Sequence, residues 1–493
     1  MPSSFPHLTP ATAARASIGV ALPRYDRARL RPGIVHLGLG AFFRAHGALY
    51  IEDILGTDPA PWGIVGVSLQ RPDQRDRLAP QGCLYTARER EPEAPQTRIV
   101  GSVLGVLVAP EAPQAVLAAM AAEETRIVSL TVTEKGYCLA PATGRLDAAH
   151  PDIRHDLAHP AAPRSAVGLI AAALGRRRAA GLAPFTVLCC DNLMGNGALL
   201  AGLVREFAAL SDDGLAQWIE RNAAFPATMV DRIVPATTSA DVAAVAAELG
   251  LHDAAPVLHE RFRQWVIEDR FVDGHRPPWE RAGAELVGDV APYEHMKLRM
   301  LNASHSALAY LGYLGGHETI ADAVADPTLA AYLRRLWAEI APMVPPPPGV
   351  SLAAYAEALL RRYANPTIRH RTWQIAMDGS QKLPVRLLPT IRERLRQGLP
   401  LPCLALAVAA WIRYAGGTDE RGVAIDVRDP LAGALRGALD AAGATPAARV
   451  AAALGFAAIF GADLPADAGF VAAVTDAYDA LLRHGARAAA HAA

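Results

Sequence analysis

The chain has 493 residues and balances 48 lysines and arginines against 49 aspartates and glutamates. A single hydrophobic core usually stops growing at about 250 to 300 residues, so this length predicts at least two domains. The near-neutral charge gives no reason to expect binding to nucleic acid or to an anionic membrane surface.

Cysteine usage and hydropathy predict where the protein works. The five cysteines are scattered and none belongs to a C-x-x-C pair, which fits a reducing compartment and offers no metal-ligand spacing. The first residues lack the charged and apolar segments of a secretory signal. The longest apolar runs, 403–412 and 450–462, are shorter than the ~20 residues that span a bilayer. We therefore expect a soluble, cytoplasmic protein.

The first strong pattern is a strand, a glycine turn and a helix. Residues 33–39 read GIVHLGL and lead into Gly40, and a helical pattern follows directly. In this setting backbone N–H groups can receive a pyrophosphate, so Gly38 and Gly40 are candidate cofactor residues. Phe43 stands where a G-x-G-x-x-G fingerprint has its third glycine. The two glycines alone leave dinucleotide binding and an ordinary turn equally open.

The second predicted strand bears on the choice of cofactor. Residues 62–69 read WGIVGVSL and lead into Gln70 and Arg71, where an acidic residue would accept a hydrogen bond from the ribose of NAD. Arg71 could instead meet the 2′-phosphate of NADP, or it is an ordinary solvated loop charge. NADP therefore stays open beside NAD.

Further strands and helices alternate along the first 290 or so residues. We predict strand-like runs at 98–107, interrupted by Gly101, and at 126–133 and 185–190, and helices at 113–123 and 165–178. This alternation predicts an α/β fold with a doubly wound, mainly parallel sheet, which binds ligands at the carboxyl ends of its strands. The adjacent Cys189 and Cys190 should point to opposite faces of a buried strand.

Polar residues gather where predicted strands end. The segments 133–137 and 191–197 each follow a strand. Asn192 is placed to donate its amide to a substrate oxygen, although Asp-Asn before Gly-Asn-Gly is also an ordinary turn pattern. Asp231 and Arg232 lie between apolar residues, as a structural ion pair or as part of a site wall.

Helical periodicity replaces strand signals after about residue 290, so we place a domain boundary between residues 288 and 289. Helices are predicted at 294–314, 329–340, 352–363, 384–397, 404–414 and 446–460. The segments 369–374 and 378–384 form a polar and basic stretch before a helix that begins at Pro384. That stretch suits an anionic or polyhydroxy substrate, and equally a solvated helix entry.

The helix predicted over 293–310 carries the strongest catalytic candidates. At about 100° per residue, Asn302 lies roughly 140° and His305 roughly 80° from Lys297, which puts the three on one face. A lysine among apolar residues is solvated, paired or pushed towards its neutral form, and a neutral lysine is a general base. Asn302 could donate to the oxygen on which charge develops, and His305 could fix a neighbouring hydroxyl. The alternative is an amphipathic helix with a snorkelling lysine and a satisfied histidine.

Six motifs in this order resemble the polyol-specific long-chain dehydrogenases, the family of mannitol 2-dehydrogenase and fructuronate reductase. They are GLGAFFRAH (38–46), SLTVTEKGYC (129–138), CDNLMGNG (190–197), MVDRIVP (229–235), KLRMLNASHSALAYLG (297–312) and DGSQKLP (378–384). The resemblance implies a Rossmann-type first domain, a mostly α-helical second domain and an active site in the cleft between them. Phe43 is a departure, since family members often have histidine at this position.

The resemblance also implies metal-independent hydride transfer to NAD, with Lys297 as the general acid and base and with Asn302 and His305 beside it. Asn192 would complete an oxyanion pair with Asn302, and Glu134 would lie near a proton path. Asp231 and Lys382 match positions that contact substrate hydroxyls in the family. The expected cofactor residues are Gly38, Gly40, Phe42, Arg44, Gln70, Arg71 and Thr133.

The substrate is predicted from two departures within the family. Lys135 stands before Gly136, where many mannitol dehydrogenases have two glycines, and residues 370–384 look more like fructuronate reductases. Lys135 or Arg371 could pair with the carboxylate of a sugar acid, or either is a surface charge. We predict interconversion of D-fructuronate and D-mannonate by a monomer or homodimer. The alternatives are a mannitol 2-dehydrogenase or other hexitol dehydrogenase, a catalytically silent sugar- or nucleotide-binding homologue, and a metal-dependent dehydrogenase, which the cysteine and histidine spacings do not support.

Overall fold

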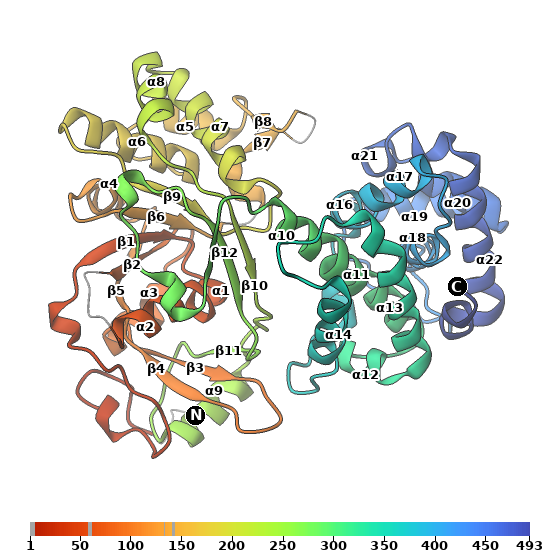
Figure 1. Ribbon diagram of the computed structural model, residues 1–493, viewed down its shortest axis with the longest axis horizontal. Helices are drawn as coiled ribbons and strands as arrows, with labels where there is room; N and C mark the ends of the chain where they lie inside the picture. The colour runs from red at the N-terminus through yellow and green to blue at the C-terminus, as the bar shows by residue number, and fades with distance from the viewer. Residues whose placement is uncertain (1–4, 58–61, 133, 141–142) are drawn as a thin grey trace. The chain divides into compact units, whose positions relative to one another are not determined.

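The structure is a computed structural model that describes residues 5–57, 62–132, 134–140 and 143–493, with residues 134 and 135 described by their backbone only. The chain divides into two compact units, Met1–Ala291 and Pro292–Ala493. Each unit has its own hydrophobic core, and each is described by itself below (Figure 1).

The first unit is built around a parallel sheet of five strands (Figure 1). The strand order is β5, β2, β1, β6, β9, and every neighbouring pair is parallel. The chain moves outward from β1 first to one side and then to the other, which creates the switch point where α/β sheets bind ligands. The predicted doubly wound fold is confirmed. The strands are β1 Pro32–Leu37, β2 Gly63–Ser68, β5 Val103–Val108, β6 Ile127–Leu130 and β9 Thr186–Cys189.

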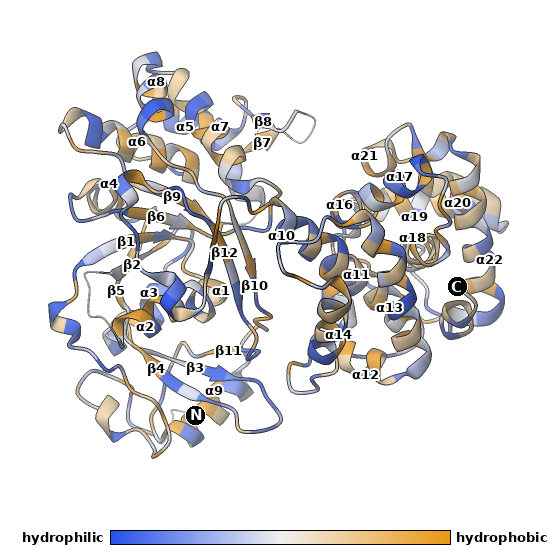
Figure 2. Ribbon diagram, in the orientation of Figure 1, coloured by the Kyte–Doolittle hydropathy of each residue, from blue (hydrophilic) through white to orange (hydrophobic). Residues whose placement is uncertain are grey.

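Both faces of this sheet are covered by apolar side chains, which is why its strands are continuous hydrophobic runs rather than alternating ones. Figure 2 shows β6 and β9 mostly in the hydrophobic colour. Cys189 packs in one hydrophobic cluster and Cys190 in another, so the two side chains point to opposite faces as predicted. The first cluster contains residues of α4 Pro113–Ala121, α6 Ala166–Ala179 and α7 Asn196–Ala209, and the second contains residues of α2 Gly47–Leu55.

Two smaller three-stranded sheets also belong to the first unit. The run over residues 98–107 is divided at the predicted interruption, Gly101, because the residues before Gly101 and those after Ser102 belong to different sheets. The buried Glu52 carboxylate accepts hydrogen bonds from both backbone N–H groups at 2.9 Å, so this backbone cannot pair with a strand. The strands are β3 Tyr85–Glu89, β4 Thr97–Val100 and β11 Val257–His259 in one sheet, and β10 Thr228–Asp231, β12 Gln264–Glu268 and β13 Glu285–Val287 in the other.

Shorter elements connect these strands. A two-stranded ribbon pairs β7 Leu139–Ala140 with β8 Arg145–Leu146, and a short helical turn, Glu134–Tyr137, follows β6. Other helices of this unit are α1 Ala41–Ala45, α3 Asp73–Leu78, α5 Pro151–Ala158, α8 Asp213–Asn222 and α9 Ser239–Leu249.

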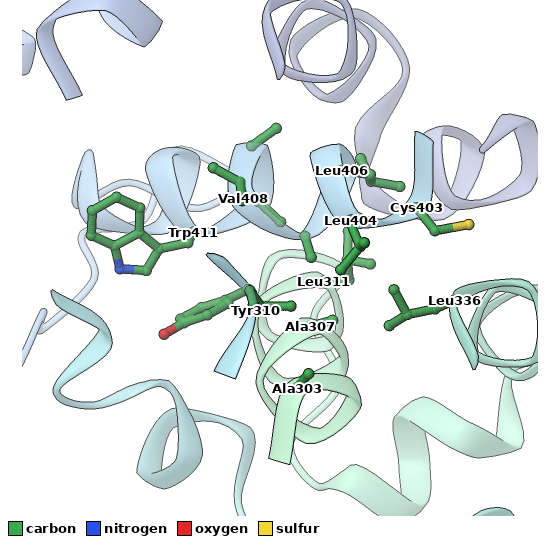
Figure 3. Close-up of a cluster of buried hydrophobic side chains, with 14 of the residues drawn as sticks. Ala303, Ala307, Tyr310, Leu311, Leu336, Cys403, Leu404, Leu406, Val408 and Trp411 are labelled. Carbon is green, nitrogen blue, oxygen red and sulfur yellow. The ribbon is translucent and has the colours of Figure 1, made fainter. Parts of the chain in front are cut away.

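The second unit is helical in the part of the chain that the structure describes, as predicted. Its central helix, α11, is buried along almost its whole length. Figure 3 shows Leu311 of α11 beside Leu404 of α18, with Ala307 and then Ala303 further along α11 and Leu336 of α13 nearby. The small alanines let the neighbouring helices approach closely, so α11 is held rigidly at the centre of this core.

The helices of the second unit follow α10, which runs over Ala291–Met296 at the boundary of the units. They are α11 Ala303–Leu314, α12 Ile320–Ala325, α13 Pro327–Ile340, α14 Leu352–Tyr363, α15 Thr372–Ala376, α16 Gly379–Arg386, α17 Leu388–Arg396, α18 Pro402–Ala415, α19 Ala432–Ala441, α20 Pro446–Leu454, α21 Ala457–Phe460 and α22 Ala468–Ala492. Among the described residues, no helix is both long and apolar enough to cross a bilayer.

The predicted helix over 384–397 is wrong at its start. The chain forms two helices there, and Pro384 lies inside the first of them, α16. Asp429 accepts hydrogen bonds from the Ser380 backbone N–H at 2.7 Å and from the Ser380 hydroxyl at 2.6 Å, which satisfies the first turn of α16. The polar stretch over 378–384 is therefore a helix rather than a helix entry.

Candidate functional site

A cavity of about 960 Å³ lies in the first unit at the carboxyl ends of β1, β2 and β6. This is the switch point of the parallel sheet, and the volume is at the upper end of the range for ligand pockets. Of the predicted cofactor residues, Gly38, Gly40, Gln70 and Arg71 line it. The wall also includes Asp73, Gln74, Asp152, His155, Arg164 and Ser165, which no sequence motif had indicated.

The glycine turn at the end of β1 is shaped by two different constraints. Gly38 has φ +91°, and a Cβ there would collide with the carbonyl oxygen of Thr131. Gly40 has φ −87°, and the nearest atom to a Cβ would be the Gly38 oxygen at 3.8 Å. Gly38 is therefore required by the fold, whereas Gly40 leaves open the space through which a ligand can approach the backbone.

Phe43 replaces the third glycine without opening the turn. Its ring stacks on His36 with centroids 3.3 Å apart. The His36 ring is held by the hydroxyls of Ser129 at 2.9 Å and Thr131 at 3.0 Å, and burial lowers its pKa to about 3. Four residues further on, Gly47 makes room for the Phe43 ring, because a Cβ at Gly47 would lie 2.6 Å from it. Close packing of helix on strand is thus kept by a different glycine.

Three predicted cofactor residues do not lie on the described wall of this cavity. Arg44 is 4% exposed, donates to the carbonyl oxygen of Ala255 at 2.5 Å and lies 5.2 Å from the Tyr85 ring centroid. The Arg44 charge is therefore engaged inside the core, and its role in binding the cofactor stays a prediction. Phe42 stacks on His46 and does not line the cavity. Thr133 lies outside the described residues.

The strand ends of the first unit bring the predicted polar segments together. Asp191 accepts hydrogen bonds from the Val132 backbone N–H at 2.9 Å and from the Tyr137 hydroxyl at 2.6 Å, which joins the segments after β6 and β9. Asn196 then bonds the backbone of Thr228 through both its amide atoms. Asn196 is thus the structural residue of the Asp-Asn-x-x-Gly-Asn-Gly pattern, and Asn192 is left exposed at the carboxyl end of the sheet.

Asp231 and Arg232 lie at the end of β10 and have different surroundings. Asp231 is buried at the last position of the strand. The Arg232 guanidinium donates to the backbone carbonyls of Ala45, Glu260 and Arg261, so it ties separate segments of the core together. Arg232 is thus structural. The side chains of Glu134 and Lys135 are outside the described residues.

In the second unit the three catalytic candidates lie around a π-helical segment. Residues Lys297–Asn302 form π-helix between α10 and α11. Hydrogen bonding from i to i+5 places residues five apart above one another, which brings Asn302 closer to Lys297 than an α-helix would. Lys297 is 6% exposed. Arg299, inside the same segment, is held by Glu393 at 2.6 and 2.8 Å. Such π segments are frequent at functional sites.

His305 lies in the first turn of α11, just after this segment, and its ring belongs to a cluster of aromatic rings. Its ring stacks on Tyr363 with centroids 5.1 Å apart and meets the His370 ring edge-on at 4.9 Å. Burial, together with nearby His370 and Arg386, holds the pKa of His305 well below its usual range. Its buried Nε2 has no hydrogen-bond partner among the described residues. The unpartnered Nε2 favours a site role over a satisfied core histidine, and that role stays a prediction.

The basic residues near this cluster are already engaged to different degrees. Arg386 donates to the Ser306 hydroxyl at 3.0 Å, and Lys382 donates from Nζ to the carbonyl oxygen of Ile375 at 2.9 Å. Arg371 forms an exposed ion pair with Glu318. A substrate carboxylate at Arg371 would therefore compete with Glu318.

One group of metal-ligating residue types occurs in the described chain, on the edge of the cavity of the first unit. Cys138, His150 and Asp152 each offer one ligand atom, and these three atoms lie within 4.8 Å of one another. His150 accepts a hydrogen bond from the Asp152 backbone N–H at 3.2 Å and caps α5, and burial raises the pKa of the Cys138 thiol to about 12. His150 serves as a helix cap and the Cys138 thiol is protonated. These roles explain why the residues lie together, so we assign no metal to them.

Comparison with known proteins identifies the family. The model of the mannitol dehydrogenase Rossmann domain matches residues 32–281, and that of the mannitol dehydrogenase C-terminal domain matches residues 289–482. The chain is 50% identical to D-mannonate oxidoreductase of Escherichia coli K12 over 97% of this chain and 98% of that protein. It is 43% identical to a mannitol 2-dehydrogenase of Phaeosphaeria nodorum over 95% of this chain and 82% of that one.

A solved structure agrees with these relatives. The fold matches a ternary complex of Pseudomonas fluorescens mannitol 2-dehydrogenase with NAD and D-mannitol, with a TM-score of 0.89, 39% identity and 98% of each chain covered. Both halves of this chain are thus accounted for by one group of oxidoreductases. The chain belongs to the mannitol dehydrogenase family.

Proposed function

We propose that this protein is an NAD-dependent oxidoreductase that interconverts D-fructuronate and D-mannonate without a metal. The observation that carries the enzymatic assignment is the buried Lys297 on a π turn with Asn302, followed by His305 with an unpartnered Nε2. The sugar acid is favoured by the 50% identity to D-mannonate oxidoreductase, which spans nearly both chains.

The cavity of the first unit fits a nicotinamide dinucleotide. Gly40 leaves its backbone accessible there, and Gln70 and Arg71 follow β2, where the adenosine ribose is read in dinucleotide-binding sheets. The relative bound to NAD supports NAD as the cofactor, and Arg71 keeps NADP as an alternative. When bound, the nicotinamide supplies the hydride acceptor or donor. We assign residues 1–288 to the cofactor domain and 289–493 to the catalytic domain.

The side chains of the second unit handle the proton and the substrate oxygen. In oxidation, Lys297 takes the hydroxyl proton as the carbon loses its hydride, and in reduction it returns that proton to the alkoxide. Its burial keeps bulk water away from the transferred proton. Asn302 donates its amide N–H to the oxygen on which charge develops. His305 fixes a neighbouring hydroxyl through its Nε2.

The remaining roles follow from the family resemblance. Asn192 is a second amide donor, and Asp231 and Lys382 bind substrate hydroxyls. The carboxylate is bound by Lys135 or Arg371, as expected for an anionic rather than a neutral substrate. Glu134 serves the proton path.

The experiment that tests this function is a comparison of initial rates with NADH and NADPH against D-fructuronate and D-fructose in one buffer. We expect kcat/KM for D-fructuronate to be at least about tenfold higher, since one charge-assisted hydrogen bond is worth roughly that factor. A preference for D-fructose would make the protein a mannitol 2-dehydrogenase, the second candidate, which the 39% identical complex with D-mannitol favours. If neither sugar causes oxidation of NADH or NADPH, the catalytically silent homologue would be the remaining candidate.

A further inference from the structure

Two histidine nitrogens in the second unit are buried without a partner. In the described chain, His305 Nε2 and His370 Nδ1 are the histidine nitrogens that are shielded from solvent and make no hydrogen bond. Other buried histidines are bonded, as for His46 Nε2 to the Gln264 carbonyl oxygen at 2.9 Å and His259 Nδ1 to the Glu260 carbonyl oxygen at 2.8 Å. A buried polar atom without a partner is costly, so two such nitrogens side by side are candidates to bind a ligand.

The two unpartnered nitrogens belong to rings in direct contact. The centroids of His305 and His370 are 4.9 Å apart, with the planes at 72°. Tyr363 stacks on His305 and is itself fixed, because its hydroxyl donates to the Leu301 carbonyl oxygen at 2.9 Å. The pair therefore keeps its geometry without a ligand.

The backbone holds His370 in place at a conformational cost. Arg369, directly before it, has φ +50°, a left-handed conformation that a residue with a long side chain seldom adopts. The His370 carbonyl oxygen accepts a hydrogen bond from the Ile320 backbone N–H at 2.9 Å, and Arg371 bridges to Thr319. This anchoring aims the ring at His305 rather than at solvent.

The electrostatic surroundings select the ligand. Burial lowers the pKa of His305, and the nearby cations Arg386, Arg362 and Lys382 lower it further. Burial, with a smaller contribution from Lys382, lowers the pKa of His370 to about 4. Both imidazoles are thus neutral at physiological pH, and each can donate at one nitrogen and accept at the other. A neutral imidazole pair among cations suits hydroxyl groups on an anionic carbon chain.

We infer that His370 is a second histidine of the substrate site, whose Nδ1 binds the hydroxyl next to the one bound by His305. The inference rests on the proposed function and deepens it, since two adjacent imidazoles select a ligand with hydroxyls on neighbouring carbons. It also makes Tyr363 a positioning residue, which holds His305 against His370.

The test compares two substitutions at one position. His370→Asn puts an amide near the place of Nδ1, whereas His370→Phe keeps the aromatic ring and has no polar atom. In the full-length protein we expect His370→Phe to raise KM for D-mannonate about tenfold, with His370→Asn much closer to wild type and KM for NAD unchanged in both. A purely structural ring would give the opposite order, because the phenyl ring preserves the packing.

A matched control and a second measurement keep the outcomes separate. His317→Phe alters a half-buried histidine outside this pair, and KM should stay at the wild-type value. Calorimetric titration of D-mannonate into each protein measures binding without turnover. Weaker binding of D-mannonate to His370→Phe than to the wild type supports the inference even if the wild type is inactive. Inactivity of the wild type would overturn only the proposed function. Unchanged binding and KM in His370→Phe, or no binding to the wild type, would overturn the inference.

Discussion

Gly38 offers a test of the glycine turn that separates conformational strain from collision. In Gly38→Ala the new residue must keep φ +91°, which costs about 1–3 kcal/mol for a non-glycine residue. Its Cβ also meets the Thr131 carbonyl oxygen, just beyond β6, which cannot retreat because β6 is paired with β1 and β9. We expect a total loss of about 2–4 kcal/mol, which lowers the melting temperature of this unit by roughly 4–16 °C.

Gly181→Ala is the matched control for this prediction. Gly181 has φ +68° and nothing within 4 Å of a Cβ, so its substitution carries the strain without the collision. Thermal unfolding followed by circular dichroism should therefore give a clearly smaller drop for Gly181→Ala than for Gly38→Ala. Equal drops would refute the argument that the Thr131 carbonyl oxygen fixes a glycine at position 38.

Gly40→Ala completes the comparison at the same turn. The φ of −87° is open to alanine, and the Cβ would have 3.8 Å of space, so stability should be unchanged or rise by up to about 1 kcal/mol. The Cβ would instead occupy space at the cavity wall, and KM for NAD should rise about tenfold. A wild-type KM for NAD would show that the cofactor does not approach Gly40.

Three further predictions concern the proton, the pH and the carboxylate. Lys297→Met should lower kcat by about 10²–10⁴-fold with KM for NADH unchanged, measured by cofactor absorbance; full activity would remove the lysine from the mechanism. Burial lowers the pKa of His46 to about 3, so its contribution to stability is complete above pH 6.5 and is lost as pH falls, by about 2 kcal/mol at pH 5. Urea unfolding at pH 7 and pH 5 should therefore show a shallower loss for His46→Phe than for the wild type. Arg371→Gln should raise KM for D-fructuronate about tenfold and leave KM for D-fructose unchanged. If neither KM changes, the ion pair of Arg371 with Glu318 is only a surface contact and Arg371 does not bind the carboxylate.

The fold could be predicted wherever one local pattern dominates. Buried parallel strands are continuous apolar runs, so β1, β2, β6 and β9 could be placed from the sequence alone. Gly101 could be recognised as an interruption of the run over 98–107, but not its cause, which is the distant Glu52 carboxylate that accepts from the backbone N–H groups there. The prediction failed at Pro384, since the cap from Asp429 starts α16 earlier than the proline suggested. Both contacts come from partners about fifty residues away, which no local window contains.

The same distinction applies to the candidate site. Lys297, Asn302 and His305 could be grouped by periodicity because they share one helix, yet the assumed 100° per residue left Asn302 at the edge of that face. The π segment over Lys297–Asn302 corrects this, because one turn of π-helix spans about five residues and brings Asn302 into line with Lys297. The sequence does not reveal such a turn, which persists only where tertiary contacts such as the Arg299–Glu393 ion pair hold it. His370 is farther from prediction still, since 65 residues separate it from His305 and only the folded second unit brings their unpartnered nitrogens together. A sequence can therefore name the residues that carry the chemistry along one helix, but the residues that complete the site from other helices depend on the packing of the whole unit.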